Sequence, residues 1–127
     1  MLTHSGAFSG FSTDDIAAAR AFYAGTLGIP VKEGEGMLTL ELGGGHRVLI
    51  YPKEDHRAAT YTVLNFEVAD IDAAVDELTA AGVELERYPG SPQDERGVVR
   101  EWGPPIAWFT DPAGNILSVI QTAGSDA

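Results

Sequence analysis

The chain has 127 residues, of which 44% are hydrophobic and 21% charged, and it contains no cysteine. This length is sufficient for one domain with its own core, and the missing cysteines exclude disulfides, zinc–thiolate sites and cysteine nucleophiles. The net charge of −11 disfavours nucleic acid and favours neutral or cationic partners. There is no run of 18 apolar residues and no signal-peptide pattern over residues 1–8, so we expect no membrane association and a cytoplasmic location.

The first half of the chain predicts one strand, one helix and then three more strands. A strand over residues 8–13 precedes Asp15, which is a typical helix N-cap. Apolar residues then recur at helical spacing as far as Leu27, and Gly28 is the expected glycine after the helix. The further strands are predicted over residues 29–31, 37–42 and 47–51, with a three-glycine turn, Gly43–Gly45, between the last two.

The second half repeats this order at an offset of 55 residues, which aligns Phe11 with Phe66 and Asp15 with Asp70. A strand over residues 61–68 is followed by a helix that Asp70 caps and Gly82 ends. A strand over residues 83–88, a polar loop and a closing hairpin complete the copy. We expect the carboxylates of that loop to form a solvated surface: Asp94, Glu95 and Glu101.

The closing hairpin covers residues 108–121 and contains an Asp-Pro-Ala-Gly-Asn turn. Pro112 presets φ for a turn, while Gly114 and Asn115 are the residue types that best accept positive φ. Alternation places Ser118 on an otherwise apolar face of the return strand, which makes it a candidate functional position.

Two βαβββ copies predict an α+β fold. We expect one domain over residues 1–127, made of module one (about 7–52), a linker (53–60) and module two (61–122). Each module has one sheet face covered by its helix, so the bare faces are expected to curl into a mixed sheet around a shared cleft. A symmetric pair of chains could complete such a cleft, so we also expect a homodimer.

The helix segments Asp15–Ile29 and Asp70–Gly82, together with the turn Asp111–Asn115, resemble the vicinal oxygen chelate superfamily. This group includes glyoxalase I, extradiol dioxygenases, fosfomycin-resistance enzymes and bleomycin-resistance proteins. The resemblance implies the paired-module fold and a ligand cleft, but it does not by itself imply one chemistry.

Enzymes of this superfamily usually bind a divalent metal through His, Glu or Gln at four strand positions. The resemblance places these positions on four residues here: Phe8, Ile50 (or Tyr51 if the register differs by one), Val63 and Ser118. Phe, Ile and Val have no donor atoms and a neutral serine is a poor ligand, so we expect neither a metal nor a cofactor. The three histidines are predicted to be solvated: His4, His46 and His56.

The expected cleft is then apolar and aromatic. Trp102, in a Gly/Pro-flanked loop, is predicted to act as a lid, and Trp108 either lines the pocket or packs in the core. The predicted ligand-binding residues are Phe8, Ser12, Ile50, Tyr51, Val63, Asn65, Trp102, Ile106, Trp108 and Ser118.

Three functions are compatible with this pattern. The first is a metal-free protein that binds a small aromatic or cationic molecule. The second is a metal-free isomerase or lyase that uses Glu67 or Tyr51 as acid or base, although Glu67 is also explained as a solvated strand residue. The third is a metal-dependent glyoxalase or dioxygenase whose ligands lie at other positions than those assigned above.

Overall fold

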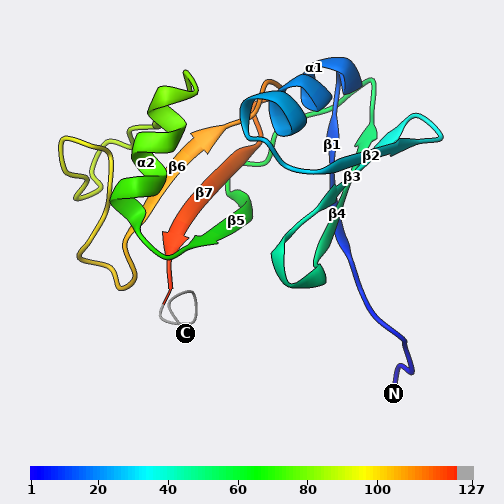
Figure 1. Cartoon of the computed structure of the whole chain (residues 1–127), viewed down its shortest axis with the longest axis horizontal. Coiled ribbons are helices and arrows are strands. Elements are labelled where there is room, and N and C mark those ends of the chain that lie inside the picture. The colour runs from blue at the N-terminus through cyan, green and yellow to red at the C-terminus, as the bar shows by residue number, and fades with distance from the viewer. Residues whose placement is uncertain (123–127) are drawn as a thin grey trace. The chain divides into compact units, whose positions relative to one another are not determined.

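A computed structural model describes residues 1–122. The chain divides into two compact units, Met1–Arg57 and Ala58–Ala127, and each is described by itself. Unit one carries the order strand, helix, three strands, and unit two begins with the same strand and helix (Figure 1). The predicted α+β class is therefore confirmed.

Unit one is a four-stranded mixed sheet with a helical segment on one face. The strands lie in the order β1-β4-β3-β2, with β1 parallel to β4 and the other pairs antiparallel. Its elements are β1 (Ser9–Thr13), α1 (Ile16–Arg20), the π-helix η1 (Ala21–Thr26), β2 (Val31–Gly34), β3 (Met37–Glu41), the 3-10 helix η2 (Gly43–Gly45) and β4 (Arg47–Pro52).

The first helix differs from the prediction because it changes type after one turn. Asp15 caps α1 as expected, since its carboxylate accepts a hydrogen bond from the amide of Ala18 at 3.0 Å. From Ala21 onward the helix widens into η1, where Leu27 N–H donates to the carbonyl of Phe22, five residues back. The wider turn buries Tyr23 completely, with its ring centroid 6.2 Å from that of Phe11.

The core of unit one lies between this helical segment and the sheet. Strand register puts Phe11, Ile50 and Leu38 in one row across β1, β4 and β3. All three are buried, and Phe11 contacts Tyr23, so this row faces the helix. The opposite side, which we call the helix-free face of unit one, carries Ser12 and Tyr51 as register partners.

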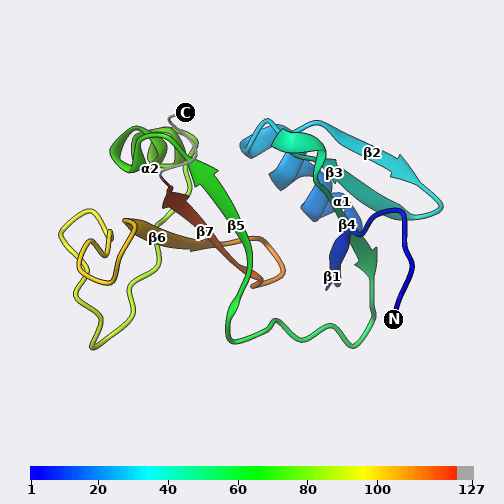
Figure 2. The same ribbon diagram turned by 90° about the horizontal axis from the view of Figure 1, so that it is seen from below.

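Unit two has a three-stranded sheet in the order β5-β7-β6, with α2 on one side (Figure 2). Its elements are β5 (Thr62–Val68), α2 (Ile71–Ala80), β6 (Ile106–Thr110) and β7 (Ile116–Gln121). The helix buries its apolar stripe against the sheet, where Phe66 and Phe109 stack with centroids 6.4 Å apart. Gln121 accepts the amide of Ile71 at 2.9 Å and so fixes the start of α2 to the end of β7.

The predicted strand over residues 83–88 is not a regular strand, because the loop that follows it also pairs with β6. Val99 exchanges two backbone hydrogen bonds with Ile106, while residues 83–88 reach β6 through Glu86 N–H to the carbonyl of Trp108 at 2.7 Å. The Gln93 side-chain amide links the two pieces, since it donates to the carbonyls of Glu86 and Gly97.

The turn between β6 and β7 forms as a compact loop around Asp111. One carboxylate oxygen accepts the amides of Ala113 and Asn115, and the other accepts the Asn115 side chain at 2.9 Å. Gly114 has the expected positive φ, of 85°. Asn115 does not, so that part of the prediction is wrong: this residue is buried and serves as a partner of Asp111.

Among the described residues, no helix combines the length and the apolar character needed to cross a membrane.

Candidate functional site

The face of the second sheet that points away from α2 gathers the side chains of greatest functional interest. We call it the helix-free face of unit two. Strand register aligns Asn65, Ser118 and Trp108 in one row across β5, β7 and β6. Their neighbours Leu64, Phe66, Ala107, Phe109, Leu117 and Val119 point to the other side, toward α2.

The polar groups of this row are hydrogen-bonded within the unit. Ser118 is fully buried, and its hydroxyl donates to the side-chain oxygen of Asn65 at 2.5 Å. The indole N–H of Trp108 donates to the hydroxyl of Thr62 at 3.1 Å. The half-buried Trp108 ring is therefore held in one orientation on a face that has no helix of its own unit over it.

Tyr88 joins this site although its position in the sequence does not single it out. Its ring meets the Trp108 ring edge to face, with centroids 5.5 Å apart and an interplanar angle of 77°. Burial, with the Glu86 charge as a smaller cause, raises the pKa of the Tyr88 hydroxyl above its ordinary value. Tyr88 closes a predicted strand, and only its tertiary contact with Trp108 identifies it as part of the site.

Other predicted residues of unit two lie around this row. Ile106 and Ile120 are register partners on the same face, and Glu67 stands next to Ile120 on an exposed part of β5. Val63 lies at a register shift in β5, where the strand departs from regular pairing. Trp102 is 63% exposed in the loop between Arg100 and Pro105.

In unit one, the structure corrects the expectation for His56. Its imidazole is half-buried and its Nδ1 lies 2.6 Å from the Ser12 hydroxyl, whereas we predicted a solvated side chain. The backbone amide of His56 donates to the carbonyl of Lys53, which closes the turn that brings the ring to β1. Ser12 and Tyr51 are neighbours on this helix-free face, and Tyr51 is 39% exposed.

Ile50 lies on the other side of the sheet from the place we predicted. It is fully buried in the row with Phe11 and faces the helix, because β4 alternates and Val48 and Ile50 share the core side. Leu49, the partner of Gly10, is on the helix-free face instead. Phe8 directly precedes β1 and is 59% exposed, with the Arg47 guanidinium 5.7 Å from its ring centroid.

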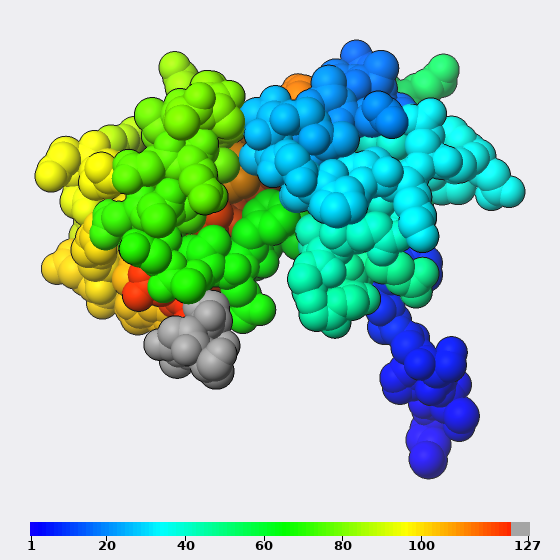
Figure 3. Space-filling view, viewed as in Figure 1, coloured from blue at the N-terminus to red at the C-terminus, as the bar shows by residue number. Residues whose placement is uncertain are grey.

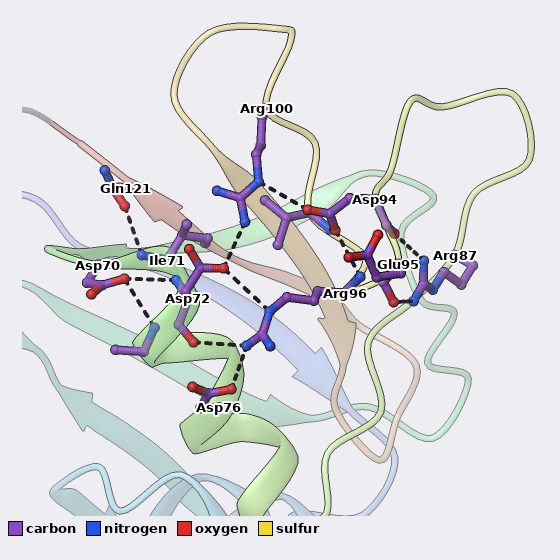
Figure 4. A network of polar contacts seen from close by, with 12 residues as sticks. Asp70, Ile71, Asp72, Asp76, Arg87, Asp94, Glu95, Arg96, Arg100 and Gln121 are labelled. Atoms are coloured by element: carbon purple, nitrogen blue, oxygen red, sulfur yellow. Dashed lines mark hydrogen bonds and ion pairs between the residues drawn. The ribbon is translucent and has the colours of Figure 1, made fainter.

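The loop after α2, which lies at the surface beside that helix (yellow in Figure 3), is fixed by an ion network (Figure 4). Arg96 bonds Asp76 at 2.5 Å, and Arg100 bridges Asp72 at 2.8 Å and Asp94 at 3.0 Å. Both arginines thus connect the loop to carboxylates of α2 or of the loop itself, and so restrict the segment that carries Trp102.

Asp94 holds this loop together through hydrogen bonds, whereas we predicted that its side chain would be solvated. Its burial acts to raise its pKa, but hydrogen bonds from the Val98 amide, Arg100 and the Arg96 amide outweigh that effect and lower the pKa below its ordinary value. The carboxylate is therefore most strongly bound in its charged form.

The donor set of these positions fits a divalent metal poorly. Of the four positions to which the resemblance assigns ligands, Phe8, Ile50 and Val63 carry no donor atom, and the Ser118 hydroxyl is bonded to Asn65. Over residues 1–122, no three His, Asp or Glu side chains are grouped so that they could hold a metal ion.

The fold agrees with the comparison with known proteins. The chain belongs to the Glyoxalase/Bleomycin resistance protein/Dioxygenase superfamily, whose family model matches residues 7–119. The predicted vicinal oxygen chelate resemblance is thereby confirmed.

Individual relatives are distant. The uncharacterized protein YraH of Bacillus subtilis is 26% identical over 123 residues, which covers 85% of this chain and 91% of that protein. A superfamily member from Sphaerobacter thermophilus has a TM-score of 0.70 at 23% identity, covering 95% of this chain and all of that one. TnmS3, an antibiotic binding protein from Streptomyces sp. CB03234, has a TM-score of 0.69 at 19% identity, covering 97% of this chain and all of that one. At these identities the structural likeness concerns the fold.

Proposed function

We propose that this protein binds a small aromatic or cationic molecule on the helix-free face of unit two, without a metal ion. The observation that carries the proposal is the fixed Trp108 ring, whose indole N–H is already bonded to Thr62. A ring held in this way offers a flat apolar surface that loses little conformational freedom when a ligand stacks on it.

The surroundings of Trp108 support an aromatic ligand. Ile106 and Ile120 extend the apolar surface, and the Tyr88 ring makes a T-shaped contact with Trp108. The exposed Glu67 carboxylate, next to Ile120, and the net charge of −11 both favour a cationic group on the ligand. The name of TnmS3 shows that this fold can serve antibiotic binding in another protein, and we extend that role to this chain as a proposal.

Tryptophan fluorescence tests the proposal directly, because the chain has two tryptophans in distinct settings. Trp102→Phe leaves Trp108 as the only reporter, and Trp108→Phe is the matched control. We expect proflavine, ethidium or bleomycin to quench the fluorescence of the Trp102→Phe protein until the signal saturates. We expect the affinity measured by calorimetry to be about tenfold weaker in Trp108→Phe. Absence of saturable quenching across all three probes would contradict the proposal.

The metal-free part of the proposal has its own test. Purified protein is incubated with nickel, zinc, manganese or ferrous iron and desalted, and its metal content is then measured by elemental analysis. We expect far less than one metal ion per chain, because the assigned positions lack donors. Near-stoichiometric metal would favour the third candidate, a metal-dependent glyoxalase or dioxygenase with other ligands, and would direct the work to those assays.

A second candidate function, a metal-free acid–base enzyme, is favoured by the Ser12–His56 pair. An imidazole in contact with a hydroxyl can accept and return a proton, and Tyr51 lies beside Ser12 on the same face. Ser12 and His56 are thus further candidates for acid–base groups, in addition to Glu67 and Tyr51. Metabolite profiling of a deletion strain complemented with wild type or His56→Gln tests it: a substrate that accumulates only without His56 supports this function, and unchanged profiles contradict it.

We also propose that the two modules form one domain and that the protein is a cytoplasmic homodimer. Light scattering on a sizing column tests the oligomeric state, with a single chain at 13.4 kDa and the dimer at twice that mass.

A further inference from the structure

The Tyr88 hydroxyl is the polar group that stands out on the helix-free face of unit two. Its oxygen is buried and has no hydrogen-bond partner among the described residues. The backbone around it is satisfied, because Tyr88 N–H donates to the Gln93 side chain at 2.7 Å and the Tyr88 carbonyl accepts from the Ser91 hydroxyl at 2.7 Å. The residue is therefore held in place by bonds that do not involve its hydroxyl.

The direction of the Tyr88 side chain is set by the segment that carries it. Val83, Glu84, Leu85 and Arg87 line a cavity of about 420 Å³ beside α2, and Tyr88 is not among its lining residues. The side chain of Tyr88 is therefore directed away from that cavity. The edge-to-face contact with Trp108 agrees with this, and it places Tyr88 beside the ring proposed to stack the ligand.

The neighbouring polar groups of the face already have partners. Trp108 N–H bonds Thr62, and Ser118 O–H bonds Asn65. A buried hydroxyl without a partner is destabilising, so such a group in a native protein calls for an explanation, of which a functional role is one. A tyrosine hydroxyl is a protonated donor at neutral pH, and burial raises the pKa of this one further.

We infer that the Tyr88 hydroxyl donates a hydrogen bond to an acceptor atom at the edge of the bound ligand. The ligand class is then a planar aromatic molecule that stacks on Trp108 and carries a carbonyl oxygen or an unprotonated ring nitrogen at the edge facing Tyr88. This inference rests on the proposed function, and it adds the chemical feature by which the site would select one aromatic compound over another of the same shape.

The first test is stability without any ligand. Tyr88→Phe removes the unpartnered hydroxyl and keeps the ring contact with Trp108, so we expect the melting temperature to rise by about 3 °C or more. Tyr61→Phe is the matched control, since Tyr61 is 70% exposed and its hydroxyl is free to bond water. A melting temperature of Tyr88→Phe equal to or below that of wild type would overturn the inference, because the hydroxyl would then have a structural partner.

The second test is selectivity, measured with quinoline and naphthalene at pH 8. These probes have the same shape and differ in one acceptor nitrogen. The titrations follow the NMR signal of the Trp108 indole N–H. This signal is identified as the one that is missing from the spectrum of Trp108→Phe. We expect Tyr88→Phe to weaken quinoline binding about fivefold to tenfold and to leave naphthalene binding unchanged or slightly stronger.

The outcomes separate this inference from the proposed function. If both probes shift the Trp108 signal and Tyr88→Phe changes neither affinity, Tyr88 has no ligand role while aromatic binding stands. If neither probe shifts the signal at millimolar concentration, aromatic binding at Trp108 fails, and the inference fails with it. If Tyr88→Phe weakened the binding of quinoline and of naphthalene equally, Tyr88 would have only a packing role, and this would also overturn the inference.

Discussion

The two units begin with the same strand and capped helix, and they diverge after the helix. In unit one, β2 comes directly after the helical segment and pairs along four residues with β3. In unit two, the corresponding residues 83–88 reach β6 through Glu86, because Val99 from the inserted loop occupies β6 at Ile106. The inserted loop thus takes the place of a regular edge strand, and side-chain hydrogen bonds fix it. Tyr88 lies beside Trp108 as a result.

The helix-free faces of the two units differ accordingly. Unit one carries a hydrogen-bonded Ser12–His56 pair next to the exposed Tyr51, which is chemistry for proton transfer. Unit two carries an aromatic pair, Tyr88 and Trp108, above a satisfied Ser118–Asn65 contact, which is chemistry for binding. The two helix-free faces therefore carry different side-chain chemistry, although both units begin with the same strand and capped helix.

The largest expected effect comes from the equivalent phenylalanines of the two cores. Phe11 is 8% exposed and contacts Tyr23, whereas Phe66 is only half-buried. We expect Phe11→Ala to lower the free energy of unfolding by about 3–5 kcal/mol and Phe66→Ala by about half as much. Urea denaturation followed by circular dichroism measures both. An equal or larger loss of unfolding free energy in Phe66→Ala would contradict the prediction. It would mean that Phe66 contributes as much to its core as Phe11 does, despite its greater exposure.

Asp94 has no counterpart in unit one, and it should give unit two its own acid sensitivity. Because the folded pKa of Asp94 lies below its ordinary value near 3.8, its contribution is complete above about pH 4 and is lost as pH falls through the folded value. We expect Asp94→Asn to cost about 1 kcal/mol at pH 7 and to flatten the loss of stability below pH 4. Denaturation from pH 2 to 7 measures this, and parallel curves for the two proteins would contradict it.

The two helix caps should differ by a smaller amount. Asp15 accepts one amide, from Ala18, while Asp70 accepts the amides of Asp72 and Ala73. We expect each change to alanine to cost about 1 kcal/mol, with Asp70→Ala the more costly. Asp14→Ala, at an exposed position outside the cap, is the control. The prediction fails if that control is as destabilising as the cap variants.

The smallest effects should come from the ion pairs, which also differ between the units. Arg100 bridges two carboxylates in unit two, and Arg20 pairs with Glu33 in unit one. We expect Arg100→Gln to lower the melting temperature by about 1–2 °C in low salt, and Arg20→Gln by less. In 1 M sodium chloride both differences should vanish, because exposed charges are then screened. A difference that persists in high salt would indicate lost packing instead.

Much of the fold was predictable because it depends on local signals. The caps Asp15 and Asp70, the spacing of apolar residues in both helices and the turn at Asp111 act over a few residues, so the sequence predicts them well. The same spacing does not distinguish an α-helix from η1, which begins after Arg20 and carries Tyr23, buried against Phe11.

The strand faces show where prediction from sequence ends. Alternation in the last strand correctly separates Ser118 from Leu117 and Val119, because the turn fixes where the strand begins. In β4 the preceding glycine turn did not settle which residues face the core, and the one-residue uncertainty between Ile50 and Tyr51 put a core residue among the predicted ligand contacts.

The amino-acid sequence by itself determined the duplicated α+β plan, the family and the acidic net charge. It also determined that most of the expected metal positions hold residues without donor atoms. All of these are properties of residue type and spacing. Tertiary structure alone decided which side chains meet. His56 reaches Ser12 across 44 positions, and Tyr88 meets Trp108 because a loop with no regular period folds back onto β6. Contacts of this kind depend on chain paths through loops, where backbone geometry is set by side-chain hydrogen bonds such as those of Gln93 and Asp94, not by periodicity.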